Sequence, residues 1–409
     1  MEKVLRNSAW LISAQIFTKA IAFFYTLFLA RSLGVSDFGL YVVALSYFAL
    51  ISSIADLGIT RYLTREIALS GQKIGSILST SMLFRLIILA ITFLGFALAN
   101  FLFDSDKLRG YLSVLAVLAI LPQGISLTLD AVFIALHRNK FSAIGAVFLS
   151  IATSTTGFLL VQSSLGVFGA VMAVTFGQII YALALALLSG WQKVDFWDKP
   201  DFAQISKILK GSAPYGFLGA IGLLYFRVDT LILSYIKGSY DTGIYGAAYK
   251  FLEALVFIPG SLALTLFPVM AKLHEIDNAQ IKSLYLKIMG LMSVLGLLVA
   301  IVFILILPIV IRIFLPAYLS SIQVIQVLAI SIPFMFVHVP ASQVLLSSNK
   351  YLKPIILISV ANLAFNVILN LIYIPMFGYM AAAWITVASD VLSLLLLSLV
   401  IQRYFFRNA

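Results

Sequence analysis

The sequence predicts an all-α membrane protein whose twelve transmembrane helices form two six-helix bundles, related by a parallel pseudo-two-fold axis. The first observation is composition, because 62% of the 409 residues are hydrophobic and only 11% are charged, whereas a soluble domain carries about 25% charged residues. The second is that apolar residues fall into blocks of about 20, the length of helix that crosses the roughly 30 Å apolar core of a bilayer. The third is an internal repeat at about half the chain length.

The apolar blocks predict the individual spans. They are 8–30, 38–60, 77–103, 111–136, 142–163, 166–190, 215–236, 243–270, 288–311, 322–346, 355–374 and 378–401. Residues 1–190 are therefore expected to form the N-terminal six-helix bundle, 191–214 a cytoplasmic linker, and 215–409 the C-terminal six-helix bundle. Within the linker, 202–210 is expected to form a separate short amphipathic helix at the membrane surface.

The distribution of basic residues predicts the orientation. Of the 27 Lys and Arg residues, 18 fall on the side of the two termini, 5 on the opposite side and 4 within spans. Because basic residues favour the cytoplasmic side, both termini are expected to be cytoplasmic, in a multi-pass protein of the plasma (inner) membrane. The formal net charge of +11 does not indicate nucleic-acid binding, since these residues are spread over many loops.

Three sequence matches, in the same order in both halves, indicate a duplication. They pair 37–44 (DFGLYVVA) with 241–248 (DTGIYGAA), Asn139-Lys140 with Asn349-Lys350, and Phe168-Gly169 with Phe377-Gly378. Six spans per repeat make both halves enter the membrane in the same direction. A site is then expected between the halves, near the middle of the bilayer.

Nine charged residues fall within the predicted spans. They are Lys19, Asp56, Arg85, Asp130, Arg227, Asp229, Lys250, Glu253 and Asp390. A charged side chain at the centre of a lipid-facing helix costs about 2.5–3.5 kcal/mol, so these residues are expected to face protein or water, as in a transport cavity. Lys19, Arg85 and Arg227 would attract an anion, and diphosphate suits them because guanidinium binds phosphate through two parallel hydrogen bonds.

Polar residues of the eleventh span lie on one stripe. Asn362, Asn366 and Asn370 are expected to hydrogen-bond a sugar. The alternative is that the asparagines hold helices together, a common use of polar residues in membrane bundles.

Four carboxylates are expected to bind a coupling ion, H⁺ or Na⁺. They are Asp229, Glu253, Asp130 and Asp390. Structural alternatives stay open: Lys250 and Glu253 could form a local ion pair, Asp56 could be a cap or loop partner, and serine or threonine hydroxyls could satisfy Asp130 and Asp390. His338 is a less favoured candidate for a proton relay.

The sequence argues against an enzyme. The chain has no cysteine, which excludes disulfides, thiolate metal sites and cysteine nucleophiles. It has no phosphate-binding G-x-x-x-x-G-K-[ST] loop, no H-E-x-x-H and no G-x-S-x-G. No cofactor is expected beyond the coupling ion.

Several strings resemble a known family. They are Asn7-Ser8-Ala9-Trp10, 29–45 (LARSLGVSDFGLYVVAL), 54–68 (IADLGITRYLTREIA), 227–233 (RVDTLIL), 241–250 (DTGIYGAAYK) and 377–384 (FGYMAAAW). These are similar to polysaccharide flippases, the Wzx-type O-antigen and repeat-unit transporters in the polysaccharide transport branch of the MOP exporter superfamily.

The resemblance implies two bundles that give alternating access to a central cationic cavity. The implied substrate is a polyprenyl-diphosphate-linked oligosaccharide, moved from the cytoplasmic to the outer leaflet by an ion gradient or membrane potential. Implied partners are this substrate, membrane lipids, and polysaccharide polymerases or glycosyltransferases, around a monomeric transporter. Two alternatives stay open: a MATE-like, cation-coupled multidrug and toxin extrusion exporter with the same twelve-span plan, and a non-transporting scaffold of an envelope assembly complex.

Overall fold

The computed structural model describes residues 2–70, 74–191, 198–263, 270, 278–346 and 349–403. Within these ranges all regular structure is helical, with no β-strand. Eight helices of this part are long and apolar enough to cross a membrane. The predicted all-α membrane fold class is therefore confirmed.

The helices of the described residues follow one another along the chain. They are α1 (Glu2–Asp56), α2 (Ile59–Ser70), α3 (Ile74–Phe103), α4 (Lys107–Val117), α5 (Ile120–Ala135), α6 (Asn139–Leu160), η1 (Val161–Leu165), α7 (Gly166–Trp191), α8 (Gln204–Leu255), α10 (Asn278–Phe314), η2 (Pro316–Tyr318), α11 (Ser321–Leu346), η3 (Asn349–Tyr351) and α12 (Leu352–Ile401). The end of the predicted eighth span, 264–269, and linker residues 192–197 lie outside the described residues.

Three of the longest helices are interrupted by a glycine with positive φ. Gly34 breaks α1 at φ 74°, Gly238 breaks α8 at φ 83°, and Gly378 breaks α12 at φ 55°. The turn η1 similarly separates α6 from α7, with Ser164 at φ 69°. A straight helix of 50 residues would be about 75 Å long, more than twice the roughly 30 Å apolar core, so each break leaves two segments of spanning length.

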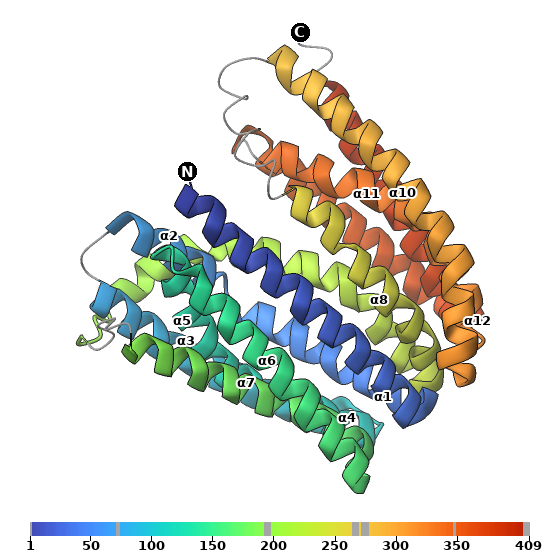
Figure 1. Ribbon diagram of the computed structural model, residues 1–409, viewed down its shortest axis with the longest axis horizontal. Coiled ribbons are helices and arrows are strands. Elements are labelled where there is room, and N and C mark those ends of the chain that lie inside the picture. Colours follow the sequence, from blue (N-terminus) through green and yellow to red (C-terminus); the bar gives the residue numbers. More distant parts are fainter. Residues whose placement is uncertain are drawn as a thin grey trace. The chain divides into compact units, whose positions relative to one another are not determined.

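The contacts divide the chain into two compact units, Met1–Leu224 and Tyr225–Ala409. In the first unit α6 packs on both α7 and α1, while α5 packs on α7, α2 and α3. Figure 1 shows α6 and α7 running alongside each other in green. In the second unit α11 packs on α10 and on α12.

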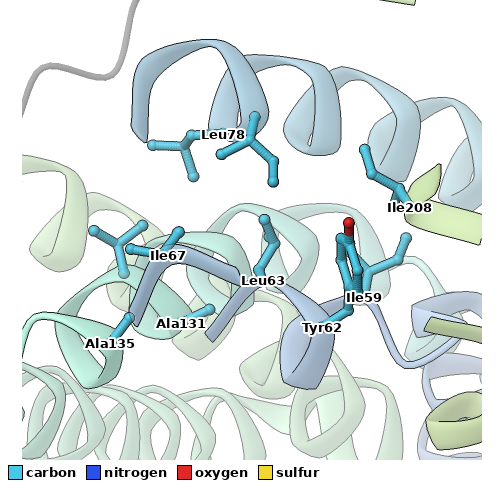
Figure 2. Close-up of a cluster of buried hydrophobic side chains, with 10 residues drawn as sticks. Ile59, Tyr62, Leu63, Ile67, Leu78, Ala131, Ala135 and Ile208 are labelled. Atoms are coloured by element: carbon cyan, nitrogen blue, oxygen red, sulfur yellow. The ribbon is translucent and has the colours of Figure 1, made fainter. Parts of the chain in front are cut away.

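A buried cluster anchors the first turns of α8 to the first unit. Ile208 of α8 belongs to a buried cluster that also contains Tyr62 and Leu63 of α2, Leu78 of α3 and Ala131 of α5 (Figure 2). The helix α2 is short and amphipathic, and this cluster buries its apolar face.

Polar contacts reinforce that attachment. Lys207 Nζ lies 2.5 Å from Glu66 Oε1 of α2, and the backbone N–H of Asp201 donates to Thr80 Oγ1 of α3 at 2.9 Å. The prediction of a separate short helix at 202–210 is wrong, since the helix that begins at Gln204 continues into the seventh predicted span. Gly211 and Pro214 are helix-breaking residue types, but the helix continues through both, and packing on α2 and α3 holds its first turns in place.

Candidate functional site

Three of the charged residues predicted within spans form one cluster in the second unit. Arg227 lies on the arm of α8 before Gly238, whereas Lys250 and Glu253 lie on the arm after it. Arg227 Nη2 donates to Glu253 Oε1 at 2.5 Å. Lys250 Nζ donates to the other carboxylate oxygen, Oε2, at 2.8 Å. The two cations therefore share one carboxylate and join the two arms of α8.

The Arg227–Lys250–Glu253 cluster contains two cations and one carboxylate, a formal charge of +1. A further carboxylate, Asp229, lies two residues from Arg227 and interacts electrostatically with it. The side chains are 13% (Arg227), 23% (Lys250) and 31% (Glu253) exposed, so they are neither dry nor fully solvated. The structure thus contains the local ion pair that the sequence left open for Lys250, but that pair also engages Arg227.

Asp229 is buried and satisfied by neutral donors. Its carboxylate accepts the Tyr245 hydroxyl and, at 2.6 Å, the backbone N–H of Thr230. The same tyrosine hydroxyl lies 3.2 Å from Thr386 Oγ1 on α12. Because Arg227 and Asp229 are two residues apart on one helix, they point in different directions and join separate networks.

Asp390 on α12 meets two partners from two other helices. The Tyr225 hydroxyl of α8 donates to Asp390 Oδ1 at 2.9 Å, and His338 Nε2 of α11 lies 3.1 Å from the same oxygen. The sequence left serine or threonine hydroxyls open as partners of Asp390. Tyrosine and histidine occupy these positions instead.

The three predicted sugar-binding asparagines are buried between the two arms of α12. Asn362 Nδ2 donates to Ser393 Oγ at 2.6 Å and Asn366 Nδ2 to Ser389 Oγ at 3.1 Å. Asn370 Nδ2 donates to Asn366 Oδ1 at 2.8 Å. This arrangement corresponds to the helix-joining alternative, and a role in sugar binding stays a prediction.

Arg85 of α3 is enclosed in the first unit. Its guanidinium Nη2 lies 2.7 Å from Asp56 Oδ1 and 2.9 Å from Thr60 Oγ1, and Nη1 lies 2.8 Å from Thr128 Oγ1. The side chain is only 1% exposed. Asp56 is thus a partner in a buried ion pair, and the predicted contact between Arg85 and substrate stays a prediction.

The other predicted residues of the first unit are Lys19 and Asp130. Lys19 lies on α1 with an exposed side chain. Asp130 of α5 lies beside the hydroxyls of Ser142 and Tyr181, which come from α6 and α7. Among the described residues, no hydrogen-bond partner reaches Asp130 Oδ1, so its carboxylate keeps an oxygen that a proton or cation could use.

Sequence reasoning missed the tyrosines that satisfy these carboxylates. Tyr225 and Tyr245 carry no charge, so a search for charges within spans passes over them. Tyr245 had a signal in the repeat, where it matches Tyr41. No comparable sequence signal marks Tyr225.

The chain matches a protein-family model described as "Polysaccharide biosynthesis protein" over residues 4–274. It belongs to this family. The predicted family is therefore confirmed. The residues that match the polysaccharide biosynthesis family extend from the first turn of α1 past the end of α8.

Two relatives come from the archaeon Haloferax volcanii. "Probable low-salt glycan biosynthesis flippase Agl15" is 24% identical over 282 residues, which cover 67% of this chain and 57% of that protein. "Probable flippase AglR" is 25% identical over 268 residues, covering 64% and 54%. The match thus spans little more than half the length of each relative.

Solved structures share the fold. "Lipid II flippase MurJ, inward closed conformation" superposes with a TM-score of 0.78 at 13% identity, covering 96% of this chain and 87% of that one. The MATE multidrug transporter DinF-BH gives a TM-score of 0.64 at 13% identity, covering 98% and 95%. A MOP superfamily transporter from Pyrococcus furiosus gives 0.64 at 13% identity, with the same coverage.

Proposed function

We propose that this family member is a secondary transporter that flips a polyprenyl-diphosphate-linked oligosaccharide from the cytoplasmic to the outer leaflet. The mechanism would be alternating access between two bundles of six spans each. The protein would lie in the plasma (inner) membrane with both termini cytoplasmic. The observation that carries the proposal is the Arg227–Lys250–Glu253 cluster, in which two cations share one carboxylate within membrane-spanning helices. The Haloferax relatives are named as probable flippases, which supports the proposed function.

The chemistry of the cluster favours an anionic ligand. A residual positive charge in surroundings of low dielectric interacts more strongly with an anion than it would in water. Arg227 offers a planar fork that fits phosphate oxygens, and Lys250 adds a point charge. Lys19 of α1 is exposed and supplies a further cation in the proposal. Arg85 and the three asparagines have partners within their units, and their contacts with substrate remain part of the proposal.

Ion coupling is proposed for the carboxylates of the spans. A diphosphate that binds Arg227 and Lys250 would compete with Glu253 for them, and a Glu253 carboxylate released from its partners would gain affinity for a proton or Na⁺. Asp130 has an oxygen without a partner among the described residues, while Asp229 and Asp390 are held by neutral hydroxyls. These groups would bias the equilibrium between inward and outward states.

The test is flipping in proteoliposomes with a polyprenyl diphosphate that carries a fluorescent oligosaccharide, followed with a membrane-impermeant quencher. Arg227→Ala should lower affinity and rate at least roughly tenfold, since a hydrogen bond to a charged group contributes about 1.5–3 kcal/mol. Arg227→Lys should be intermediate, because it keeps the charge and loses the fork. Lys353→Ala, at an exposed lysine of α12, is the matched control and should flip normally.

Two results would favour the other functions. Export of ethidium-like organic cations together with no binding of the labelled diphosphate would favour a MATE-like, cation-coupled exporter. A folded wild-type protein that flips neither ligand would favour a non-transporting scaffold.

Glycosyltransferases that make the lipid-linked sugar and polymerases that use it are the proposed partners of a monomeric transporter.

A further inference from the structure

Asp390 Oδ1 lies within hydrogen-bond distance of two side chains of different acidity. It accepts the Tyr225 hydroxyl at 2.9 Å and lies 3.1 Å from His338 Nε2. The three side chains come from α8, α12 and α11, so the oxygen joins three helices of the second unit. Histidine is the side chain whose ordinary protonation change falls nearest neutral pH.

The pair is well enclosed, with His338 14% and Asp390 6% exposed. Its ionisable surroundings within the described residues are few. From α8, Tyr225 donates to Asp390. From α10, residues 288–311 contain no ionisable side chain. There α10 contacts α11 close to His338, as a Cβ on Gly296 would lie 2.9 Å from Pro333 Cα.

The same network reaches the cation cluster along α8. Tyr225 precedes Arg227 by two residues on one arm of the helix. Asp390 is thus linked, through the Tyr225 hydroxyl, to the arm of α8 that carries Arg227, a residue that we propose to bind diphosphate.

We propose that His338 and Asp390 form a proton-binding site that controls the Arg227–Lys250–Glu253 cluster through Tyr225, an inference that rests on the proposed flippase function for its role in transport. With a neutral imidazole and an ionised carboxylate, the pair carries a charge of −1. One proton from the aqueous phase binds the free imidazole nitrogen and makes the pair an imidazolium–carboxylate with no net charge. The same proton returns to water when the pair reverts.

The shared oxygen explains how this proton acts on α8. An imidazolium binds a carboxylate more strongly than a neutral imidazole does, because both groups are then charged. Since His338 and Tyr225 use the same oxygen, a stronger His338 contact weakens the one from Tyr225. The arm of α8 that carries Arg227 is then held less firmly. Proton uptake thus alters affinity for the diphosphate without any contact between His338 and the ligand.

The direct test is a titration of the histidines by NMR. The full chain contains only three, His137, His274 and His338, so ¹³C-labelled histidine gives three ring signals in detergent or nanodiscs. His338→Asn identifies its own signal by loss. His137→Asn is the control, because asparagine tolerates the positive φ of 55° at that position.

The His338 signal should change with pH, and Asp390→Asn should alter that dependence, because the substitution removes the carboxylate that faces the imidazole. Asp130→Asn, a matched change in the first unit, should leave it in place. A His338 signal that never titrates, or that ignores Asp390→Asn, would overturn the site. This measurement needs no transport.

The coupling is tested by binding of the labelled polyprenyl diphosphate across the same pH range. Affinity should vary at least threefold with pH in the wild type and become independent of pH in His338→Asn. Tyr225→Phe should keep the histidine titration and abolish the pH dependence of binding. Unchanged pH dependence in either variant refutes the link. If the protein binds no diphosphate at all, the proposed function fails while the NMR result still decides the proton site.

Discussion

Arg85 shows how a buried cation is accommodated at a single position. It donates to Asp56, Thr60 and Thr128 from a site that leaves it 1% exposed. Breaking a buried ion pair leaves one charge without its partner and destabilises a protein by about 3–5 kcal/mol, whereas replacing both partners with apolar groups costs much less. The guanidinium therefore contributes mainly to the position of α2 and α5 relative to α3.

We expect Arg85→Met to lower the free energy of unfolding by about 3 kcal/mol, near the low end of that range because Asp56 is 19% exposed. The double variant Arg85→Met/Asp56→Leu should recover at least half of this loss. Unfolding in detergent, followed by helix content, measures both. A single variant with unchanged stability but weaker binding of the labelled diphosphate would instead support the predicted substrate contact of Arg85.

Residue-level reasoning identified the unusual positions and offered one correct pairing, Lys250 with Glu253, but it missed the other partners. The cost of a charge in lipid singled out Arg85, Arg227 and Glu253 from the sequence alone. Which charges meet depends on how the arms of α8 fold back and how α3 packs, and spacing along one helix does not determine this. The asparagine stripe was recognised, yet its serine partners lie on the other arm of α12, beyond the reach of periodicity.

At the level of elements, α8 approaches the connection between α1 and α2 so closely that only glycine fits. A Cβ on Gly216 would lie 2.5 Å from the Leu57 carbonyl carbon, and one on Gly58 would lie 2.4 Å from the Gly216 nitrogen. Both contacts are with backbone, which cannot rotate away as a side chain can. Gly222, further along the same helix, has no atom within 4 Å of such a Cβ.

Gly216→Ala should therefore destabilise the protein by about 1–3 kcal/mol, the usual cost of overpacking. Gly222→Ala is the matched control and should be neutral or stabilising by up to about 1 kcal/mol, because alanine favours helix over glycine. In detergent, the midpoint of thermal unfolding should be lower for Gly216→Ala than for Gly222→Ala. Equal midpoints would show that α8 does not pack against Leu57 in solution.

Sequence patterns located the helix breaks better than the helix starts. Gly34 and Gly238 lie in predicted connections, because a short polar stretch with glycine interrupts an apolar run. The separate helix at 202–210 was wrong, since no local signal distinguishes an amphipathic surface helix from the first turns of a long one. Whether these residues form a separate helix or the first turns of α8 depends on the packing of Ile208 in the cluster of α2 and α3. That packing joins distant parts of the sequence.

For the whole molecule, the number of membrane crossings depends on whether each break reverses the chain. Eight long apolar helices are found among the described residues; division of α1, α8 and α12 at their glycines, and of the α6–α7 stretch at η1, gives twelve segments. Composition predicts the segments because each must be apolar. It does not show which side each loop faces, which we infer from 18 against 5 basic residues.

The absence of cysteine from the sequence allows this topology to be tested with single cysteines and a membrane-impermeant maleimide on intact cells. Lys107→Cys and Lys237→Cys, at exposed outer positions, should be labelled, whereas Arg61→Cys and Lys353→Cys, at exposed cytoplasmic positions, should react only after permeabilisation. Arg61 follows the break at Gly34, Lys237 follows η1 and Lys353 follows Gly238, whereas Lys107 follows the same break as Arg61. Labelling of Arg61→Cys would mean that the chain does not reverse at Gly34. Protection of Lys237→Cys would mean that it does not reverse at η1. Labelling of Lys353→Cys would mean that it does not reverse at Gly238. Any one of these results would contradict the parallel six-plus-six arrangement.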